Sequence, residues 1–329
     1  MNVDVHAHIM ARSFYGPLGL MSGIHATVHT AYDRSDDALP LQDAWFEPDH
    51  QLRDMDRKGI DMRLVSLSIP GIYVFRREDQ PDLAKRVNDE AIALACRHPD
   101  RIKVLASLPL GDVEASLEEL ERMAGSHEVA GLTIGSNVNG VSLSDQRFEP
   151  LWARINALRM PVVEHPMHNP PISGELRDMN LSTAIGYMFD TQLMVSRLIM
   201  YGIFERFPDF PFVAAHTGGG LFNVLGRMDR IAARQAICKE RMKKPFSEYA
   251  KKLYYDSCSF YAPALMQAHQ MLDSGHMMFG TDYPYVDSDD RHVMSLDIPE
   301  TDKKAIMGGA AARVFGLAAQ ETRPANPIA

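Results

Sequence analysis

Eight short apolar segments, several of them rich in β-branched residues, recur along the chain at residues 2–8, 61–69, 101–110, 129–136, 160–165, 210–216, 252–259 and 276–282. Longer stretches with apolar residues at helical spacing separate them, most clearly at 82–101, 112–125 and 146–160. Strands that alternate with helices predict repeated βα units and a parallel sheet. Eight such units predict a (β/α)8 TIM barrel of the metal-dependent hydrolase type.

From the second segment onward the predicted strands are apolar on both faces, as expected for parallel strands that helices cover on the outside. An open, doubly wound sheet is the alternative architecture. That alternative is disfavoured because no GxGxxG pattern follows the first predicted strand.

The predicted barrel fills residues 1–318 as a single domain, which is usual for a chain of 329 residues with this architecture. Residues 9–48 form a long insertion after the first strand, with glycines, prolines and little periodicity, and a loop of this kind is commonly a functional lid. A second long connection follows the fifth strand at 167–188. Residues 319–329 are expected to form a flexible tail.

Composition narrows the class of protein. Hydrophobic residues make up 46% of the chain and charged residues 23%, values typical of a soluble globular protein. A net charge of −9 argues against nucleic-acid and anionic-membrane partners and favours a small-molecule substrate. The start of the chain lacks a signal-peptide pattern, and no apolar run is long enough to span a bilayer. Three dispersed cysteines suit a reducing compartment, so we expect a cytoplasmic protein.

Histidines and one aspartate stand at the predicted carboxyl ends of strands, where a TIM barrel carries its active site. His6 and His8 end the first strand, and their two-residue spacing points both imidazoles to one side. His165 ends the fifth strand, His216 the sixth and Asp282 the eighth.

A divalent metal held by the first two histidines, His165 and Asp282 would retain an open position for water or substrate. His216 is then the predicted acid/base, because imidazole titrates near neutral pH. Any one of these histidines by itself is more often a core or surface residue. The five together at strand ends favour the metal site.

Four motifs, HxH in the first strand, "EHP" at the fifth, "AHTGGG" at the sixth and "FGTDYPY" at the eighth, resemble the amidohydrolase superfamily. The resemblance spans nearly the whole chain. It is strongest to the branch that contains aminocarboxymuconate semialdehyde decarboxylase and the hydroxybenzoate decarboxylases.

This resemblance implies one divalent metal on His6, His8, His165 and Asp282, with zinc favoured over manganese, and no organic cofactor. The bridging lysine of the two-metal members has no counterpart near the fourth strand. The resemblance also implies a homodimer in which Arg227 reaches the partner's substrate carboxylate, for which a guanidinium offers a matching fork. An equally weighted alternative is that Arg227 is simply a solvent-exposed arginine on a helix.

Other candidates for substrate contact are less specific. His168 could touch substrate, orient a neighbour or lie in a loop, and Phe222, Tyr283 and Tyr285 could line an aromatic pocket or simply pack in the core. Asp256 ends the seventh strand and is a further lining candidate, whereas Glu164 should point away from the site.

Two departures from the semialdehyde decarboxylase pattern leave the particular substrate open. No arginine closely precedes Trp45, and Met167 and His168 stand where that enzyme resembles Trp-Asp.

The leading hypothesis is a metal-dependent, cofactor-free decarboxylase of an aromatic or unsaturated carboxylic acid. The alternative is a hydrolase on the same fold, in which metal-activated water attacks an amide, a lactone or another carbonyl carbon. A catalytically silent binding protein is the third possibility. It predicts a missing ligand, and all four predicted ligands are present.

Overall fold

The computed structural model describes residues 1–15, 46–67, 69–167, 176, 179 and 181–317. It contains one parallel eight-stranded sheet in the order β1-β2-β3-β4-β7-β8-β9-β10. The strands are β1 (Val3–Ile9), β2 (Met62–Leu67), β3 (Ile102–Ser107), β4 (Val129–Gly135), β7 (Val162–His165), β8 (Phe212–Ala214), β9 (Tyr254–Asp256) and β10 (Met277–Met278). All eight predicted strands are confirmed.

Backbone hydrogen bonds bring the last strand back to the first, although β10 itself has only two residues. Val5 N donates to the Phe279 carbonyl at 3.0 Å, and His8 N donates to the Tyr283 carbonyl at 2.8 Å. Asp282 N donates to the His6 carbonyl, also at 2.8 Å. The sheet therefore closes into a TIM barrel, and the closure itself places Asp282 beside β1.

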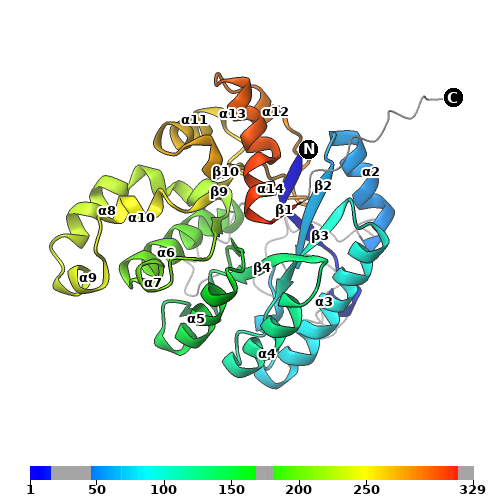
Figure 1. Ribbon diagram of the computed structural model, residues 1–329, viewed down its shortest axis with the longest axis horizontal. Helices are drawn as coiled ribbons and strands as arrows, with labels where there is room; N and C mark the ends of the chain where they lie inside the picture. Colours follow the sequence, from blue (N-terminus) through cyan, green and yellow to red (C-terminus); the bar gives the residue numbers. More distant parts are fainter. Residues whose placement is uncertain (16–45, 68, 168–175, 177–178, 180, 318–329) are drawn as a thin grey trace.

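Helices surround the barrel on its outer side (Figure 1). They are α2 (Pro48–Lys58), α3 (Gln80–Arg97), α4 (Val113–Ala124), α5 (Glu149–Leu158), α6 (Tyr187–Met200), α7 (Ile203–Arg206), α8 (Leu225–Ala232), α9 (Ala236–Arg241), α10 (Phe246–Ala250), α11 (Ala262–Met271), α12 (Arg291–Met294), α13 (Glu300–Lys304) and α14 (Ala310–Val314). The three helices predicted from spacing correspond to α3, α4 and α5. A short hairpin, β5 (Asn137–Val138) and β6 (Val141–Ser142), was not predicted.

Two apolar clusters hold the barrel together. The larger one lies between the strands and their helices. The smaller one joins side chains from opposite strands, including Val5, Leu105 and Val213, to Phe315, which follows α14. Burial of these side chains supplies the main free energy of folding and fixes the strand ends on which the polar residues stand.

Parts of the predicted organisation fall outside the described residues. Positions 16–45 of the predicted lid, the first part of the second long connection and the predicted tail 319–329 are among them. Within the described part of the chain, no helix combines the length and apolarity needed to cross a membrane.

Candidate active site

The structure brings together the four residues predicted as metal ligands. His6 and His8 lie on β1, His165 is the last residue of β7, and Asp282 follows β10. One nitrogen or oxygen atom from each lies within 4.8 Å of the corresponding atom of the other three. His165 and Asp282 stand at or just after the carboxyl ends of their strands, and β1 carries His6 at its middle and His8 next to its last residue, on the side where a barrel positions its chemistry. We call these four residues the ligand cluster.

Each imidazole of the ligand cluster has its Nδ1 atom engaged by a different partner. These pairs are His6 with the Asp256 carboxylate at 2.6 Å, His8 with the Ser66 hydroxyl at 3.0 Å and His165 with the Pro166 carbonyl at 2.9 Å. Partners of this kind fix the tautomer and leave Nε2 with its lone pair for a metal.

The Nε2 atoms of His6 and His8 lie 3.5 Å and 3.3 Å from the same Asp282 oxygen. The Nε2 atom of His6 is buried and has no hydrogen-bond partner among the described residues. A buried polar atom without a partner is unfavourable unless something else satisfies it. The residues therefore fit a divalent cation.

Burial and the crowding of imidazoles set the charges in the cluster. Burial, together with the neighbouring histidines, holds the pKa of His165 well below its ordinary value. Burial also lowers the pKa of His8, against the opposing hydrogen bond to Asp282. Two of the three imidazoles are therefore held neutral, which is the form that binds a metal.

His6 and Asp282 behave differently because opposite charges act on them. Burial works to lower the pKa of His6, but the charge and hydrogen bond of Asp256 outweigh it and raise this pKa to about 9. Burial works to raise the pKa of Asp282, but the adjacent His216 imidazole and the hydrogen bond with His8 hold it well below its ordinary value. Asp282 is therefore ionised and ready to act as an oxygen ligand.

His216 lies at the edge of the ligand cluster. Its Nε2 atom is 3.8 Å from the second carboxylate oxygen of Asp282, and its ring centre is 4.9 Å from that of His6. Its buried Nδ1 atom has no hydrogen-bond partner among the described residues. His216 is thus close enough to the cluster to exchange a proton with a substrate bound there.

A strained turn presents His216. Its own φ is +51°, and the next four residues, 217–220, also have positive φ. A Cβ atom at Gly219 would lie 2.0 Å from the Met188 carbonyl oxygen on α6, so only glycine fits there. Left-handed conformations at residues other than glycine are typical of functional sites, and Asp282, with φ +56°, is another.

Asp256 proves to be an orienting residue behind the cluster. One of its carboxylate oxygens faces His6, while the other accepts hydrogen bonds from Thr217 N at 3.2 Å and Cys258 N at 2.9 Å. It therefore links a candidate metal ligand to the turn that follows His216. Its position at a strand end was the only signal in the sequence.

The candidates for substrate contact lie in different surroundings. The ring of Tyr285 is 5.4 Å from that of His8, so Tyr285 borders the ligand cluster. The ring of Tyr283 packs against the Arg63 guanidinium at 4.4 Å instead. Phe222 is buried with its ring 4.9 Å from Tyr255.

Arg227 is exposed on α8, and no described contact joins it to the cluster. The candidate His168 falls outside the described residues. A small cavity of about 20 Å³ opens beside His165 and is lined mostly by apolar groups, including Ile72 and Met167.

The fold is a closed parallel TIM barrel, and it carries three imidazoles and a carboxylate in an arrangement that could hold a metal ion. A family model described as amidohydrolase matches residues 3–317, so the chain belongs to the amidohydrolase family.

Named relatives extend the likeness over nearly the whole chain. The 2-amino-3-carboxymuconate-6-semialdehyde decarboxylase of Dictyostelium discoideum is 26% identical over 96% of this chain and 92% of its own. A crystal structure of 5-carboxyvanillate decarboxylase from Sphingomonas paucimobilis is 26% identical and superposes with a TM-score of 0.87, over 96% of this chain and 99% of that one.

The fold is also shared with 5-carboxyvanillate decarboxylase from Novosphingobium aromaticivorans, crystallised with manganese and 4-hydroxy-3-methoxy-5-nitrobenzoic acid. That chain is 24% identical, with a TM-score of 0.85 and 96% coverage of both chains.

Proposed function

We propose that this protein is a metal-dependent, cofactor-free decarboxylase of an aromatic or unsaturated carboxylic acid. The relatives described above are all decarboxylases, which supports a carboxy-lyase. The observation that carries the metal dependence is the convergence of imidazole Nε2 atoms on Asp282 while each Nδ1 atom is engaged elsewhere.

His6, His8, His165 and Asp282 would hold the metal. A divalent cation at this point supplies positive charge that binds the substrate carboxylate and offsets charge developing in the transition state. Three imidazoles and one carboxylate suit both zinc and manganese. We favour zinc on the HxH pattern of the first strand, and metal analysis of the purified protein decides between the two.

His216 is the proton donor in this proposal. Its Nε2 atom faces Asp282, whose carboxylate keeps the imidazole oriented toward the cluster. Protonation of the carbon that bears the carboxylate breaks the conjugation of the ring or diene. Cleavage of the carbon–carbon bond then releases carbon dioxide, and its electron pair restores the conjugated system. The imidazole recovers a proton from solvent before the next turnover.

Arg227 is the proposed partner of a substrate carboxylate across a homodimer interface. Its side chain is exposed on α8 and makes no ion pair with any described residue, so it is available to a second subunit. Sedimentation that shows only monomer at micromolar concentration would contradict this part of the proposal.

The three cysteines are unpaired, which supports a reducing, cytoplasmic setting.

The decisive experiment combines metal content with a substrate panel. Purified protein should contain about one zinc or manganese per chain, and His165→Ala and Asp282→Ala should lose it. Carbon dioxide release should then be measured with hydroxybenzoates and unsaturated carboxylic acids, beside amides and lactones that report hydrolysis. Release of carbon dioxide only by the metal-loaded protein supports the proposal. Hydrolysis without carbon dioxide release, or full activity without metal, contradicts it.

A further inference from the structure

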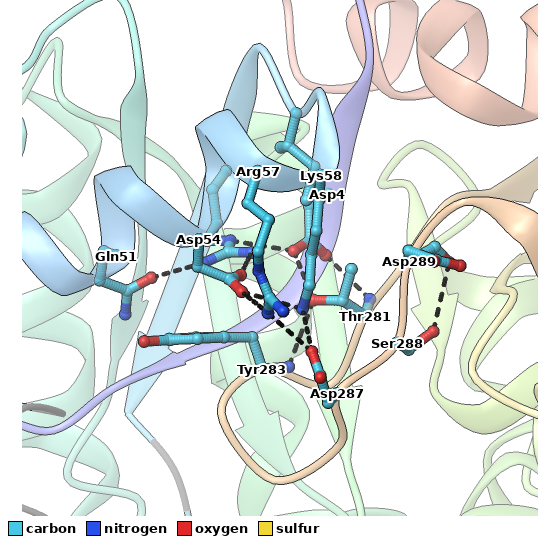
Figure 2. Close-up of polar contacts among 12 residues, drawn as sticks. Asp4, Gln51, Asp54, Arg57, Lys58, Thr281, Tyr283, Asp287, Ser288 and Asp289 are labelled. Carbon is cyan, nitrogen blue, oxygen red and sulfur yellow. Dashed lines mark hydrogen bonds and ion pairs between the residues drawn. The ribbon is translucent and has the colours of Figure 1, made fainter.

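Arg63 is a fully buried cation behind the ligand cluster, near the start of β2. Every nitrogen of its guanidinium is used: Nε donates to Asp4 at 3.0 Å, one terminal nitrogen to Gln51 at 2.8 Å and the other to Asp54 at 2.8 Å. The Tyr283 ring covers the guanidinium face at 4.4 Å. Figure 2 shows Asp4, Gln51, Asp54 and Tyr283 in one group between α2, β1 and the segment after β10.

Asp4 connects this group to the first and last strands. Its side chain is fully buried. One carboxylate oxygen accepts hydrogen bonds from His6 N at 3.2 Å and from Thr281 N at 3.1 Å. The other oxygen accepts a hydrogen bond from the Thr281 hydroxyl at 2.7 Å. Asp4 therefore holds the backbone of one candidate ligand, His6, and of the residue just before another, Asp282.

Gln51 and Tyr283 complete the connection. The amide nitrogen of Gln51 donates to the His8 carbonyl at 2.8 Å, while its oxygen accepts from Arg63. The Tyr283 carbonyl accepts from His8 N at 2.8 Å. The group around Arg63 thus reaches the main chain at or next to His6, His8 and Asp282, three of the four members of the ligand cluster.

The main effect of such a group is geometric. Burying a guanidinium and two carboxylates forfeits their hydration, and a buried ion pair adds little net stability compared with apolar packing. Its directional hydrogen bonds, however, fix the backbone to which they are made. The first strand also has a register irregularity between Asp4 and Ala7, just where the chain turns His6 toward the cluster, so this stretch depends on hydrogen bonds from outside the regular ladder.

We propose that Arg63 is a positioning residue that, through Asp4, Gln51 and Tyr283, sets the spacing of His6, His8 and Asp282 for metal binding. This inference rests on the proposed metal-dependent function and adds to it a residue that does not touch the metal. A buried group that only stabilised the fold would change the free energy of unfolding. It would not change the metal affinity or the geometry of the metal ligands.

The test uses the full chain loaded with cobalt(II), whose visible absorption reports ligand geometry. Arg63→Lys keeps the charge but cannot reach all three partners. Thr281→Val removes the hydroxyl that donates to Asp4 and that also accepts from Tyr283 N at 3.3 Å. Arg122→Lys is the matched control, because Arg122 also bridges two acids, Glu119 and Asp89, but on α4 and away from the cluster. Metal Kd is measured by competition with a chelator, and unfolding of the metal-free protein is followed in parallel.

We expect Arg63→Lys to raise the cobalt Kd about 10- to 100-fold and to change the visible spectrum, as losses behind metal ligands typically do. Thr281→Val should change the cobalt Kd and the visible spectrum in the same direction but by less. If Arg63→Lys does not fold, the result for Thr281→Val tests the positioning role. Arg122→Lys should leave the Kd and the spectrum unchanged.

Wild-type Kd and spectrum in Arg63→Lys and Thr281→Val, even with a lower Tm, would overturn the positioning role alone. A wild-type protein that binds none of cobalt, zinc and manganese would instead overturn the proposed function, and the positioning role with it.

Discussion

The carboxylate of Asp256 holds the imidazole of His6, with Oδ2 2.6 Å from Nδ1, on the side opposite the ligand cluster. Both side chains are buried. The Asp256 carboxylate accepts this bond from the proton on Nδ1, so when His6 gives up its other proton, the Nε2 lone pair faces Asp282. The geometry of the pair therefore selects the tautomer that a metal requires.

Replacement of this carboxylate should weaken the metal site. In Asp256→Asn an amide group can face Nδ1 with its NH2, which favours the opposite tautomer and places a proton on Nε2 of His6. We expect metal Kd to rise about 10- to 100-fold, as measured by chelator competition. Asp302→Asn is the control, because Asp302 pairs with His269 at 2.9 Å far from the cluster. An unchanged Kd in Asp256→Asn would show that this pair does not set the tautomer.

Metal binding should depend on pH through His6. Its pKa of about 9 in the metal-free protein means that the imidazole is protonated at neutral pH and must lose a proton when a metal binds. Affinity should therefore increase as pH rises, by about tenfold per pH unit below that pKa. In Asp256→Asn the charge that raises the pKa is gone, so the dependence above neutral pH should flatten. Equal slopes in the two proteins would contradict this assignment.

His216 should be required for turnover and not for metal binding. Its Nε2 atom lies 3.8 Å from Asp282, and it is not part of the four-residue ligand cluster. His216→Asn should lower kcat by about 10²- to 10⁴-fold, the usual contribution of a general acid or base, while zinc content remains at the wild-type value. Loss of zinc in this variant would instead make His216 a ligand.

Most of the site could be predicted because it depends on short-range rules. The two-residue spacing of His6 and His8 on a strand places both rings on one side, and residues at strand ends gather at one face of a barrel. The glycines after His216 likewise mark a turn that only they can form. These features need no knowledge of which segments pack together.

The remaining features depend on partners distant in the sequence. Arg63 stands inside an apolar segment, and only the fold shows that Asp4 and Asp54 neutralise it. Tyr283 was a candidate for substrate contact, but the left-handed residue before it reverses the strand alternation, and its ring lies against Arg63. Asp256 looked like one more polar strand end, because a sequence does not show which imidazole a carboxylate will meet.

Glu164 should make stability depend on pH. It is fully buried between Thr191 and Ala215 N, and burial raises its pKa from 4.5 to about 8. The folded protein therefore retains a proton that the unfolded chain loses first. The contribution of Glu164 to the free energy of unfolding is fully present below pH 4.5. This contribution is lost as pH rises toward 8, by up to about 1.4 kcal/mol per pH unit.

Glu164→Gln isolates that contribution, because the lowered pKa values of His8 and His165 act with the opposite sign below pH 6.5. The free energy of unfolding of metal-free wild type and Glu164→Gln should be compared by urea denaturation across this range. We expect the variant to gain stability relative to wild type as pH increases. A constant difference would mean that Glu164 is ionised in the folded protein.

The turn after His216 should tolerate no side chain at Gly219. A Cβ atom there would meet the Met188 carbonyl oxygen at 2.0 Å, and φ is +61°, so Gly219→Ala adds both a clash and backbone strain. We expect a loss of at least about 2 kcal/mol in the free energy of unfolding, together with reduced kcat, since α6 and the turn must separate to make room.

Gly226 provides the comparison for that change. It lies in α8 without a positive φ, and a Cβ atom at this position would have no neighbouring atom within 4 Å. Gly226→Ala should therefore leave stability unchanged or raise it by up to about 1 kcal/mol, as alanine does in helices. Urea denaturation of both variants separates the two outcomes. If Gly219→Ala were as stable as Gly226→Ala, the turn that carries His216 would be free to shift, and a rigid placement of the proton donor could not be part of the mechanism.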